Sequence, residues 1–182
     1  RNVTGVQTCA LPIFMNKKYT NQTHPIEPVW NGDSRILILG SFPSVKSREM
    51  AFFYGHPQNR FWKVIASIYE EELPKTIDEK KAMLLKNKIA LWDVIKSCDI
   101  IGSADNSIKN VVPNNLDVIL KNAKIEKIYV NGNQALNLYN KYLLPHLSVE
   151  AILLPSTSPA NAIYSFEKLC AIWQAKLKVE ND

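Results

Sequence analysis

Four short apolar runs, each followed by a helical pattern, constrain the fold of this chain more than any other feature of its sequence. The runs cover residues 35–39, 89–95, 127–130 and 151–154. After the first run, for example, Phe61, Ile65 and Ile68 recur at helical spacing. Strands that are apolar on both faces are typical of parallel sheets covered by helices on both sides. The alternation therefore predicts an α/β fold with a four-stranded parallel sheet, built by right-handed crossovers.

Each apolar run ends in small or polar residues. These are Gly40 and Ser41, Asp93, residues 131–133 (Asn-Gly-Asn) and residues 156–158 (Ser-Thr-Ser). Because the carboxyl ends of parallel strands lie along one edge of a sheet, and ligands bind beyond that edge, these residues should line one cleft. Asp93 is a carboxylate in an apolar run, and it either belongs to that cleft or caps a backbone turn.

The length of 182 residues is that of one domain, which can bury a core without disulfides or metals. With 22 Lys and Arg against 17 Asp and Glu, the formal net charge is +5, and this favours a polyanionic partner without identifying one. We expect the protein to act as a monomer.

The first 14 residues do not share the pattern of the rest of the chain. They show neither strand nor helical periodicity, carry Arg1 as their only charged residue, and precede Met15. They also lack the charged start and long apolar stretch of a signal peptide. We expect residues 1–14 to be a non-native leader and residues 15–182 to form the single domain.

Three further segments carry structural expectations. Residues 16–33 contain Pro25 and Pro28 and should form an extended arm over the surface, anchored by Trp30. Residues 96–112 are mostly polar and should form a long connection. A helix is expected to begin at Pro113.

Cysteine and histidine are too scattered for a metal centre. Cys9, Cys98 and Cys170 lie far apart and in no metal-ligand spacing. This pattern argues against a disulfide framework or an iron–sulfur cluster and for a reducing compartment. We therefore expect a cytoplasmic protein with no metal and no cofactor. No apolar run approaches the roughly 18 residues that a membrane-spanning helix needs.

Several familiar catalytic motifs are absent from the sequence. It contains no G-x-S-x-G nucleophile elbow, no Walker loop and no G-x-G-x-x-G. A hydrolase without these groups or a metal must place water and stabilise a leaving group. The stretch 156–161 is rich in hydroxyls and bracketed by Pro155 and Pro159. It is suited to binding phosphate through hydroxyls and backbone N–H groups, or it is an ordinary capped loop.

Three motifs, each after a predicted strand, resemble the uracil-DNA glycosylase superfamily. They are Leu39–Ser44 (LGSFPS), Gly55–Ile65 (GHPQNRFWKVI) and Leu154–Asn161 (LPSTSPAN). The His-Pro-x-Asn-Arg-Phe-Trp run is similar to the mismatch-specific uracil-DNA glycosylases. The GSFPS, LWDVI and STSPAN forms are similar to the hypoxanthine (deoxyinosine) DNA glycosylase branch. The resemblance covers about residues 35–177.

The resemblance implies a three-layer α/β/α sandwich around the four-stranded parallel sheet. It also implies a monofunctional DNA glycosylase that flips a deaminated or modified base, hypoxanthine or uracil, out of DNA and hydrolyses its N-glycosidic bond. Its partner would be DNA containing such a base, and no cofactor is required. A glycosylase for a bulkier base, a DNA-binding module without turnover, and an unrelated nucleotide-binding protein are the alternatives.

The resemblance also implies roles for individual residues. Tyr54 matches the aromatic residue that stacks on the flipped base. Phe42 stands where most of the superfamily carries an Asp or Asn that orients water, so water positioning would fall to Asn59, which alternatively caps the helix that it begins. Asp93 matches a position that contacts the base edge, or it is itself the water activator. Ser156 replaces a His or Asn that relatives present to the base or its phosphate.

The remaining site predictions follow from the same motifs. We expect Asn59 and Asp93 to be catalytic and a second group to lie beside the base: Gly40, Ser41, Phe42, Tyr54, His56, Asp93 and Ser156. A third group is expected to contact DNA phosphates: Ser44, Asn133, Ser158 and Asn161. Ala160 falls near the position of the wedge that enters the duplex, where its small side chain fills a gap poorly. Base extrusion would then depend on other residues or on a weak base pair.

Overall fold

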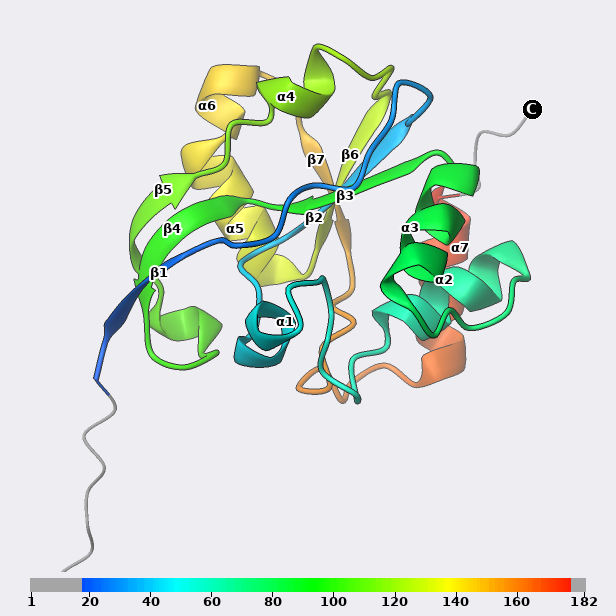
Figure 1. Cartoon of the computed structure of the whole chain (residues 1–182), viewed down its shortest axis with the longest axis horizontal. Helices are drawn as coiled ribbons and strands as arrows, with labels where there is room; N and C mark the ends of the chain where they lie inside the picture. The colour runs from blue at the N-terminus through cyan, green and yellow to red at the C-terminus, as the bar shows by residue number, and fades with distance from the viewer. Residues whose placement is uncertain (1–17, 178–182) are drawn as a thin grey trace, which may run out of the picture.

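The four predicted apolar runs form one parallel sheet in the computed structural model, which describes residues 18–177. The strands are β2 (Ile36–Gly40), β3 (Ile89–Asp93), β6 (Lys127–Asn131) and β7 (Ala151–Leu154), in the order β3-β2-β6-β7 (Figure 1). Every neighbouring pair is parallel, and Gly40 lies in register with Asp93. The predicted α/β fold is confirmed, whereas the proposed leader, residues 1–14, lies outside the described residues.

The apolar residues of β2 are divided between the two faces of this sheet. Ile38 packs into a core with α2 (Phe61–Tyr69), α3 (Ile77–Lys86) and α7 (Phe166–Leu177). Leu37 and Leu39 point to the other face, which is covered by α4 (Asp117–Leu120), α5 (Asn133–Tyr142) and α6 (Leu144–Leu147). Side chains alternate between faces along a strand, so an all-apolar run fills both cores. The two helical layers lie on opposite sides of the sheet in Figure 1, which confirms the three-layer sandwich.

A second sheet replaces the long connection that was predicted for residues 96–112, and that prediction was wrong. β1 (Thr20–Thr23), β4 (Ile95–Ile100) and β5 (Lys109–Pro113) form an antiparallel sheet in the order β1-β4-β5, with a short 3-10 helix at Asp105–Ser107. In β4 only Ile95, Cys98 and Ile100 are buried. The polar residues between them face outward and hid the strand in the sequence.

Two other boundaries differ from the predictions. The apolar run 89–95 is not one strand, because β3 ends at Asp93 and the chain turns at Val94 into β4. The Val94 and Ile95 N–H groups donate to the carbonyls of Gly40 and Ser41. Pro113 ends β5 instead of starting a helix. The helix in this segment, α4, is short and begins only at Asp117. The reason is Asn114, whose buried amide donates to the carbonyls of Asp93 and Ile95 and so holds the turn.

The N-terminal arm is extended as expected, but the body of the protein holds it at several points. Thr23 pairs with Ser97 across the antiparallel sheet. Further along, Val29 forms an antiparallel bridge with Leu91, and Val29 is buried. Trp30 packs, partly buried, against the core beneath α4 and α5. None of the helices in residues 18–177 is both long and apolar enough to cross a membrane.

Candidate active site

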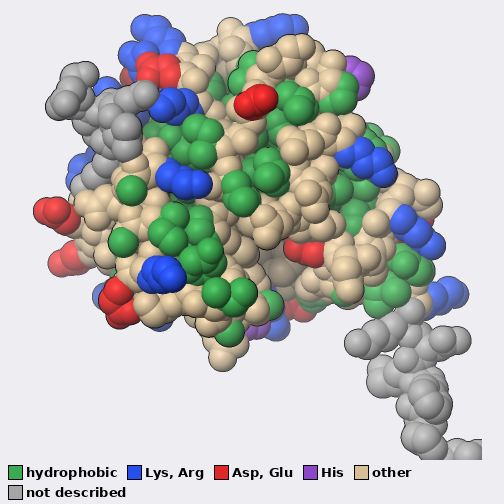
Figure 2. Space-filling model, turned by 180° about the vertical axis from the view of Figure 1, so that it is seen from behind, with side chains coloured by type: hydrophobic (Ala, Val, Ile, Leu, Met, Phe, Trp, Pro, Cys, Tyr) green, Lys and Arg blue, Asp and Glu red, His purple; other side chains and the backbone are tan. Residues whose placement is uncertain are grey.

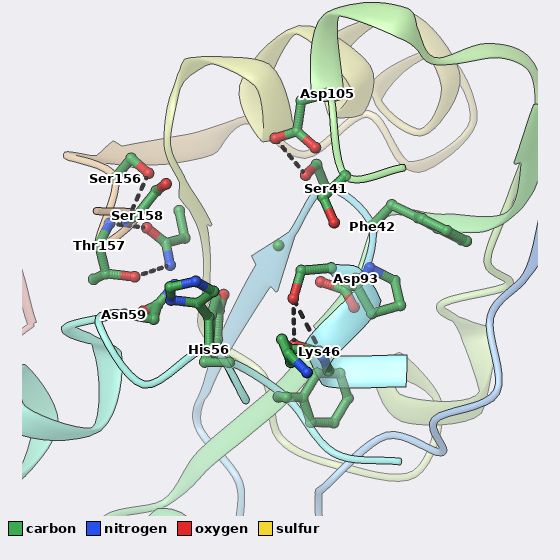
Figure 3. A pocket seen from close by; sticks show the side chains of 18 of the residues that line it. Ser41, Phe42, Lys46, His56, Asn59, Asp93, Asp105, Ser156, Thr157 and Ser158 are labelled. Atoms are coloured by element: carbon green, nitrogen blue, oxygen red, sulfur yellow. Dashed lines mark hydrogen bonds between the residues drawn. The ribbon is translucent and has the colours of Figure 1, made fainter. Parts of the chain in front are cut away.

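A cavity of about 300 Å³ opens at the carboxyl edge of the parallel sheet. Residues that end or follow each of the four parallel strands line it: Gly40 and Ser41, Asp93, Asn131, and Ser156, Thr157 and Ser158. The expected convergence of the four strand ends is therefore observed. In Figure 3 the serines that follow β7 lie on one side, Ser41 and Phe42 on another, and His56 and Asn59 between them. The volume is at the lower end of the range for small-molecule sites.

Most of the predicted site residues line this cavity. They are Gly40, Ser41, Phe42, Ser44, Tyr54, His56, Asn59, Asp93, Ser156 and Ser158. Asn133 and Asn161 do not. Asn133 is the exposed first residue of α5. The Asn161 amide instead donates to the Ser156 carbonyl (2.8 Å) and so closes the loop after β7.

Asp93 is a nearly buried carboxylate, 4% exposed, at the end of β3. One carboxylate oxygen, Oδ2, lies 2.7 Å from Nε2 of His24, whose side chain is 2% exposed. Oδ1 receives no hydrogen bond from residues 18–177. Sequence analysis missed His24, because it lies 69 positions from Asp93 in a polar arm and has no motif around it. The charge needs such a partner, since burying an unpaired carboxylate is costly.

Gly40 allows Asp93 and Tyr54 to meet at the floor of the cavity. A Cβ on Gly40 would stand 2.1 Å from Asp93 Oδ1 and 3.2 Å from the Tyr54 hydroxyl. Any other residue at this position would displace the carboxylate. The glycine is therefore required by close packing, and its place at the end of β2 fixes where Oδ1 lies.

Tyr54 forms a wall of the cavity in a strained backbone conformation, with φ at +52°. Its ring stacks on Phe61, with ring centroids 4.0 Å apart and an interplanar angle of 19°. The buried hydroxyl makes no hydrogen bond of good geometry within residues 18–177. Burial raises the pKa of Tyr54 well above its usual value, and the charge of Asp93 raises it further. The hydroxyl therefore stays protonated; the Asn131 side chain lies near enough to oppose the rise in its pKa, but no acceptor of good geometry for its hydrogen lies within residues 18–177.

Asn59 and His56 lie where the loop enters α2. Asn59 Oδ1 accepts a hydrogen bond from the Phe61 N–H (2.9 Å) and so closes a tight turn just before α2, whose N-cap residue is Arg60. This contact also fixes the orientation of the amide beside the cavity. The ring of His56 is oriented by the Gln58 N–H, which donates to Nδ1 (3.2 Å). Both side chains are therefore held in place by the backbone of their own loop.

The loop that follows β7 is held from two sides. Asn131 and Thr157 bond reciprocally: Asn131 Nδ2 donates to Thr157 Oγ1 (2.9 Å), and the Thr157 N–H donates to Asn131 Oδ1 (3.0 Å). From below, the Arg60 guanidinium donates to the carbonyls of Ser158, Asn161 and Tyr164. No carboxylate in residues 18–177 pairs with Arg60. The loop therefore rests on an uncompensated positive charge.

Asp105 is a second carboxylate of the cavity that the sequence did not indicate. It lies in the 3-10 helix between β4 and β5 and accepts a hydrogen bond from the Ser41 hydroxyl (3.3 Å). Its pKa is raised, mainly because the surrounding residues remove water from the carboxyl group; the Ser41 hydroxyl opposes this and the Asp93 charge adds to it. It was missed because its segment was expected to be an unstructured connection.

Comparison with known proteins decides the family. The sequence model of the uracil DNA glycosylase superfamily matches residues 28–177, which include the whole cavity. The chain belongs to the uracil DNA glycosylase superfamily. It is accordingly a DNA N-glycosylase, an enzyme that hydrolyses the bond between a base and its deoxyribose.

Two similar proteins and one similar solved structure come from species of Methanosarcina. A hypoxanthine DNA glycosylase of Methanosarcina acetivorans is 36% identical over 141 residues, covering 75% of this chain and 87% of that protein. A hypoxanthine DNA glycosylase of Methanosarcina barkeri is 34% identical over 135 residues, covering 74% and 85%. The solution NMR structure of a candidate uracil DNA glycosylase from Methanosarcina acetivorans has a TM-score of 0.71 at 30% identity, covering 87% of this chain and 99% of that one.

Charge alone does not mark the DNA-binding face of this glycosylase. On the face shown in Figure 2, Lys and Arg side chains are scattered among apolar and polar ones and form no continuous basic patch.

Proposed function

We propose that this glycosylase removes hypoxanthine, and less efficiently uracil, after flipping the nucleotide out of DNA, and that it is monofunctional. The observation that carries the proposal is Asp93 Oδ1, a carboxylate oxygen at the floor of the cavity with no donor from residues 18–177. Hypoxanthine carries N1–H and uracil carries N3–H, and either can donate to this oxygen. Adenine and cytosine have a bare nitrogen acceptor at the same place, which a carboxylate repels. The names of the two archaeal relatives agree with hypoxanthine as the first choice.

Tyr54 is proposed as the wall on which the flipped base stacks. One face of its ring is already covered by Phe61, so a base on the other face would extend an existing stack. Stacking of this kind contributes roughly 1–3 kcal/mol per base. The unpaired hydroxyl is a donor that the base or a bound water can satisfy.

The hydrolysis itself needs a water molecule placed beneath the sugar. The water oxygen attacks C1′, the N-glycosidic bond breaks, and its electron pair leaves with the base, which is then protonated. We assign the placing of this water to Asn59, whose amide is oriented by the Phe61 N–H. An amide is a weak base, so the reaction relies on the electron-poor sugar. Asp93 as the water activator is the alternative assignment.

Lys46 is the one lysine that lines the cavity within residues 18–177, and it is not suited to forming a Schiff base. Its ammonium group donates to Glu49 (2.8 Å), and this hydrogen bond, together with the charge of Glu49, raises the pKa of Lys46. The nitrogen is therefore protonated at neutral pH and not nucleophilic. This supports a monofunctional enzyme that leaves an abasic site.

Phosphate contacts are proposed for Ser44, Ser158, Asn133 and Asn161. Among these, Ser158 has the strongest support, because Arg60 places positive charge directly beneath its loop. Ser156 is proposed beside the base. Its hydroxyl accepts from the Ser158 N–H (3.2 Å), which orients it at the cavity wall.

We assign the wedge that supports base extrusion to Ile163 instead of Ala160. Ile163 lies in the same loop after β7 and is 84% exposed, by far the most exposed of the large apolar side chains in residues 18–177. An apolar side chain exposed to water, in a loop whose first residues line the cavity, gains free energy if it enters the base stack.

The test uses oligonucleotide duplexes with a single hypoxanthine, uracil or bulkier modified base, incubated with the protein and then heated in alkali. We expect cleavage at hypoxanthine first, at uracil second, and none without alkali. Cleavage only at bulkier bases would show that the substrate is a bulkier modified base and not hypoxanthine. Salt-sensitive binding without cleavage of any substrate would show a DNA-binding module and overturn the proposal.

A further inference from the structure

His24 is held in one tautomer by its two hydrogen bonds. The Ile26 N–H donates to Nδ1 (3.1 Å), so Nδ1 carries a lone pair and no proton. The proton of the neutral ring is therefore on Nε2, which points at Asp93 Oδ2 at 2.7 Å. A second proton on the ring would oppose the Ile26 N–H. His24 Nε2–H is thus the donor and Asp93 Oδ2 the acceptor of this hydrogen bond.

The protein holds this imidazole firmly. The His24 N–H donates to the Lys96 carbonyl, and the next residue, Pro25, restricts the backbone. The ring lies edge-on to Phe42, with ring centroids 6.0 Å apart, and against Phe53 at 6.1 Å. Two aromatic rings thus shield the hydrogen bond from water. An arm that only covered the surface would need neither these contacts nor a buried histidine.

We propose that His24 is a positioning residue that keeps Asp93 ionised and turns its Oδ1 into the cavity, so that the site selects bases carrying a ring N–H. This rests on the proposed function, in which Asp93 contacts the base edge. Without the donor, a carboxylate that is 4% exposed would be unpaired and would take up a proton. Protonated Asp93 would donate where it now accepts. It would then match adenine or cytosine better than their deaminated forms.

Three titratable groups interact with the Asp93 carboxyl: His24 from the arm by a hydrogen bond, and Tyr54 from the loop before α2 and Asp105 from the 3-10 helix through its charge. Tyr54 is neutral. Any charge on the Asp105 carboxyl is negative and opposes the ionisation of Asp93. Asp105 therefore cannot replace His24. In residues 18–177, His24 is the side chain that donates to the Asp93 carboxylate.

Two substitutions of similar size separate the two hydrogen bonds of His24. His24→Asn places an amide oxygen near the position of Nδ1, which keeps an acceptor for the Ile26 N–H but removes the donor to Asp93. His24→Gln places an amide nitrogen near the position of Nε2 and keeps that donor. Both variants keep a polar side chain in the arm. A purely structural role would make the two variants alike.

We expect His24→Asn to lower kcat/KM on hypoxanthine at neutral pH by about 10- to 100-fold, the usual effect of losing a hydrogen bond to a charged group. Activity should recover as pH rises, because Asp93 then loses its proton and accepts again. The ratio of hypoxanthine to adenine excision should fall in parallel. His24→Gln should stay within about threefold of wild type, with an unchanged pH profile. Equal losses in both variants, or a wild-type pH profile in His24→Asn, would overturn the proposal.

A second measurement does not depend on catalysis. The carboxyl carbon of Asp93, labelled with carbon-13 and identified by its loss in Asp93→Asn, is titrated by NMR in the wild type and both variants. We expect the carboxyl to titrate at a clearly higher pH in His24→Asn than in the other two. The same titration in all three proteins would overturn the proposal. If the wild type removes no base at all, the proposed function fails while this titration still tests His24.

Discussion

The two walls of the cavity are built from different chemistry. One wall, with Tyr54 and the Asp93 carboxylate that His24 holds from behind, is buried and aromatic. The other, the loop after β7, presents hydroxyls and backbone N–H groups over the Arg60 guanidinium. A buried acceptor between rings suits a flat base, and a hydroxyl loop over a cation suits a phosphate. We therefore propose that base recognition and backbone binding are separate parts of this site.

The largest effect is expected from Asn59→Ala, at the junction of the two walls. Turnover of hypoxanthine should fall by about 100-fold or more, because the water beneath the sugar loses its positioning group. DNA affinity should hardly change. Single-turnover excision and binding to a product duplex measure the two quantities. Unchanged excision would remove Asn59 from the mechanism and leave Asp93 as the residue that places the water.

Tyr54 tests the base wall in two steps. Tyr54→Ala removes both ring and hydroxyl, and we expect kcat/KM to fall by roughly 5- to 150-fold, the equivalent of 1–3 kcal/mol of stacking. Tyr54→Phe keeps the stack and removes only the hydroxyl, so its loss should be under about tenfold. Steady-state kinetics on hypoxanthine duplexes compares them. If Tyr54→Phe loses as much kcat/KM as Tyr54→Ala, the hydroxyl and not the ring makes the important contact.

Arg60 tests the backbone wall. Arg60→Gln removes the charge and leaves loop carbonyls without donors, so DNA affinity should fall by about tenfold at low salt. The single-turnover rate at saturating enzyme should stay within about threefold. Arg60→Lys restores the charge without the planar fork and serves as the control. A lowered saturated rate in Arg60→Gln with unaltered affinity would contradict the division between the two walls.

The smallest effect is expected from Ile163→Ala. The side chain is 84% exposed, so the free energy of unfolding should change by less than about 0.5 kcal/mol. Excision from duplex DNA should drop by about three- to tenfold, while excision from single strands, which need no wedge, should not change. Ile163→Leu is the matched control and should retain duplex activity. An equal drop on both substrates would show that Ile163 does not assist extrusion.

The sequence predicted an element correctly wherever the residues of one segment showed a clear apolar pattern. The four apolar runs predicted the parallel sheet, because each run fills a core on both faces. The antiparallel sheet was missed since β4 buries only every second or third residue, and such mixed strands look like polar loops. Asp105 was missed for the same reason. Asn133 was placed at the cavity by its nearness to β6 in the chain, whereas it starts α5 outside the lining.

The sequence by itself determined the strand order along the chain, the polar strand ends and the motif loops, because these depend on neighbouring residues and on the two-residue and 3.6-residue periods. Only the tertiary structure decided which side chains meet. The arm crosses β3 and β4 through backbone hydrogen bonds that any residues could make, and no local pattern encodes that path. It brings His24 to Asp93 across 69 positions of sequence. The hydrogen bond on the carboxylate at the centre of the site is therefore a contact that folding alone creates.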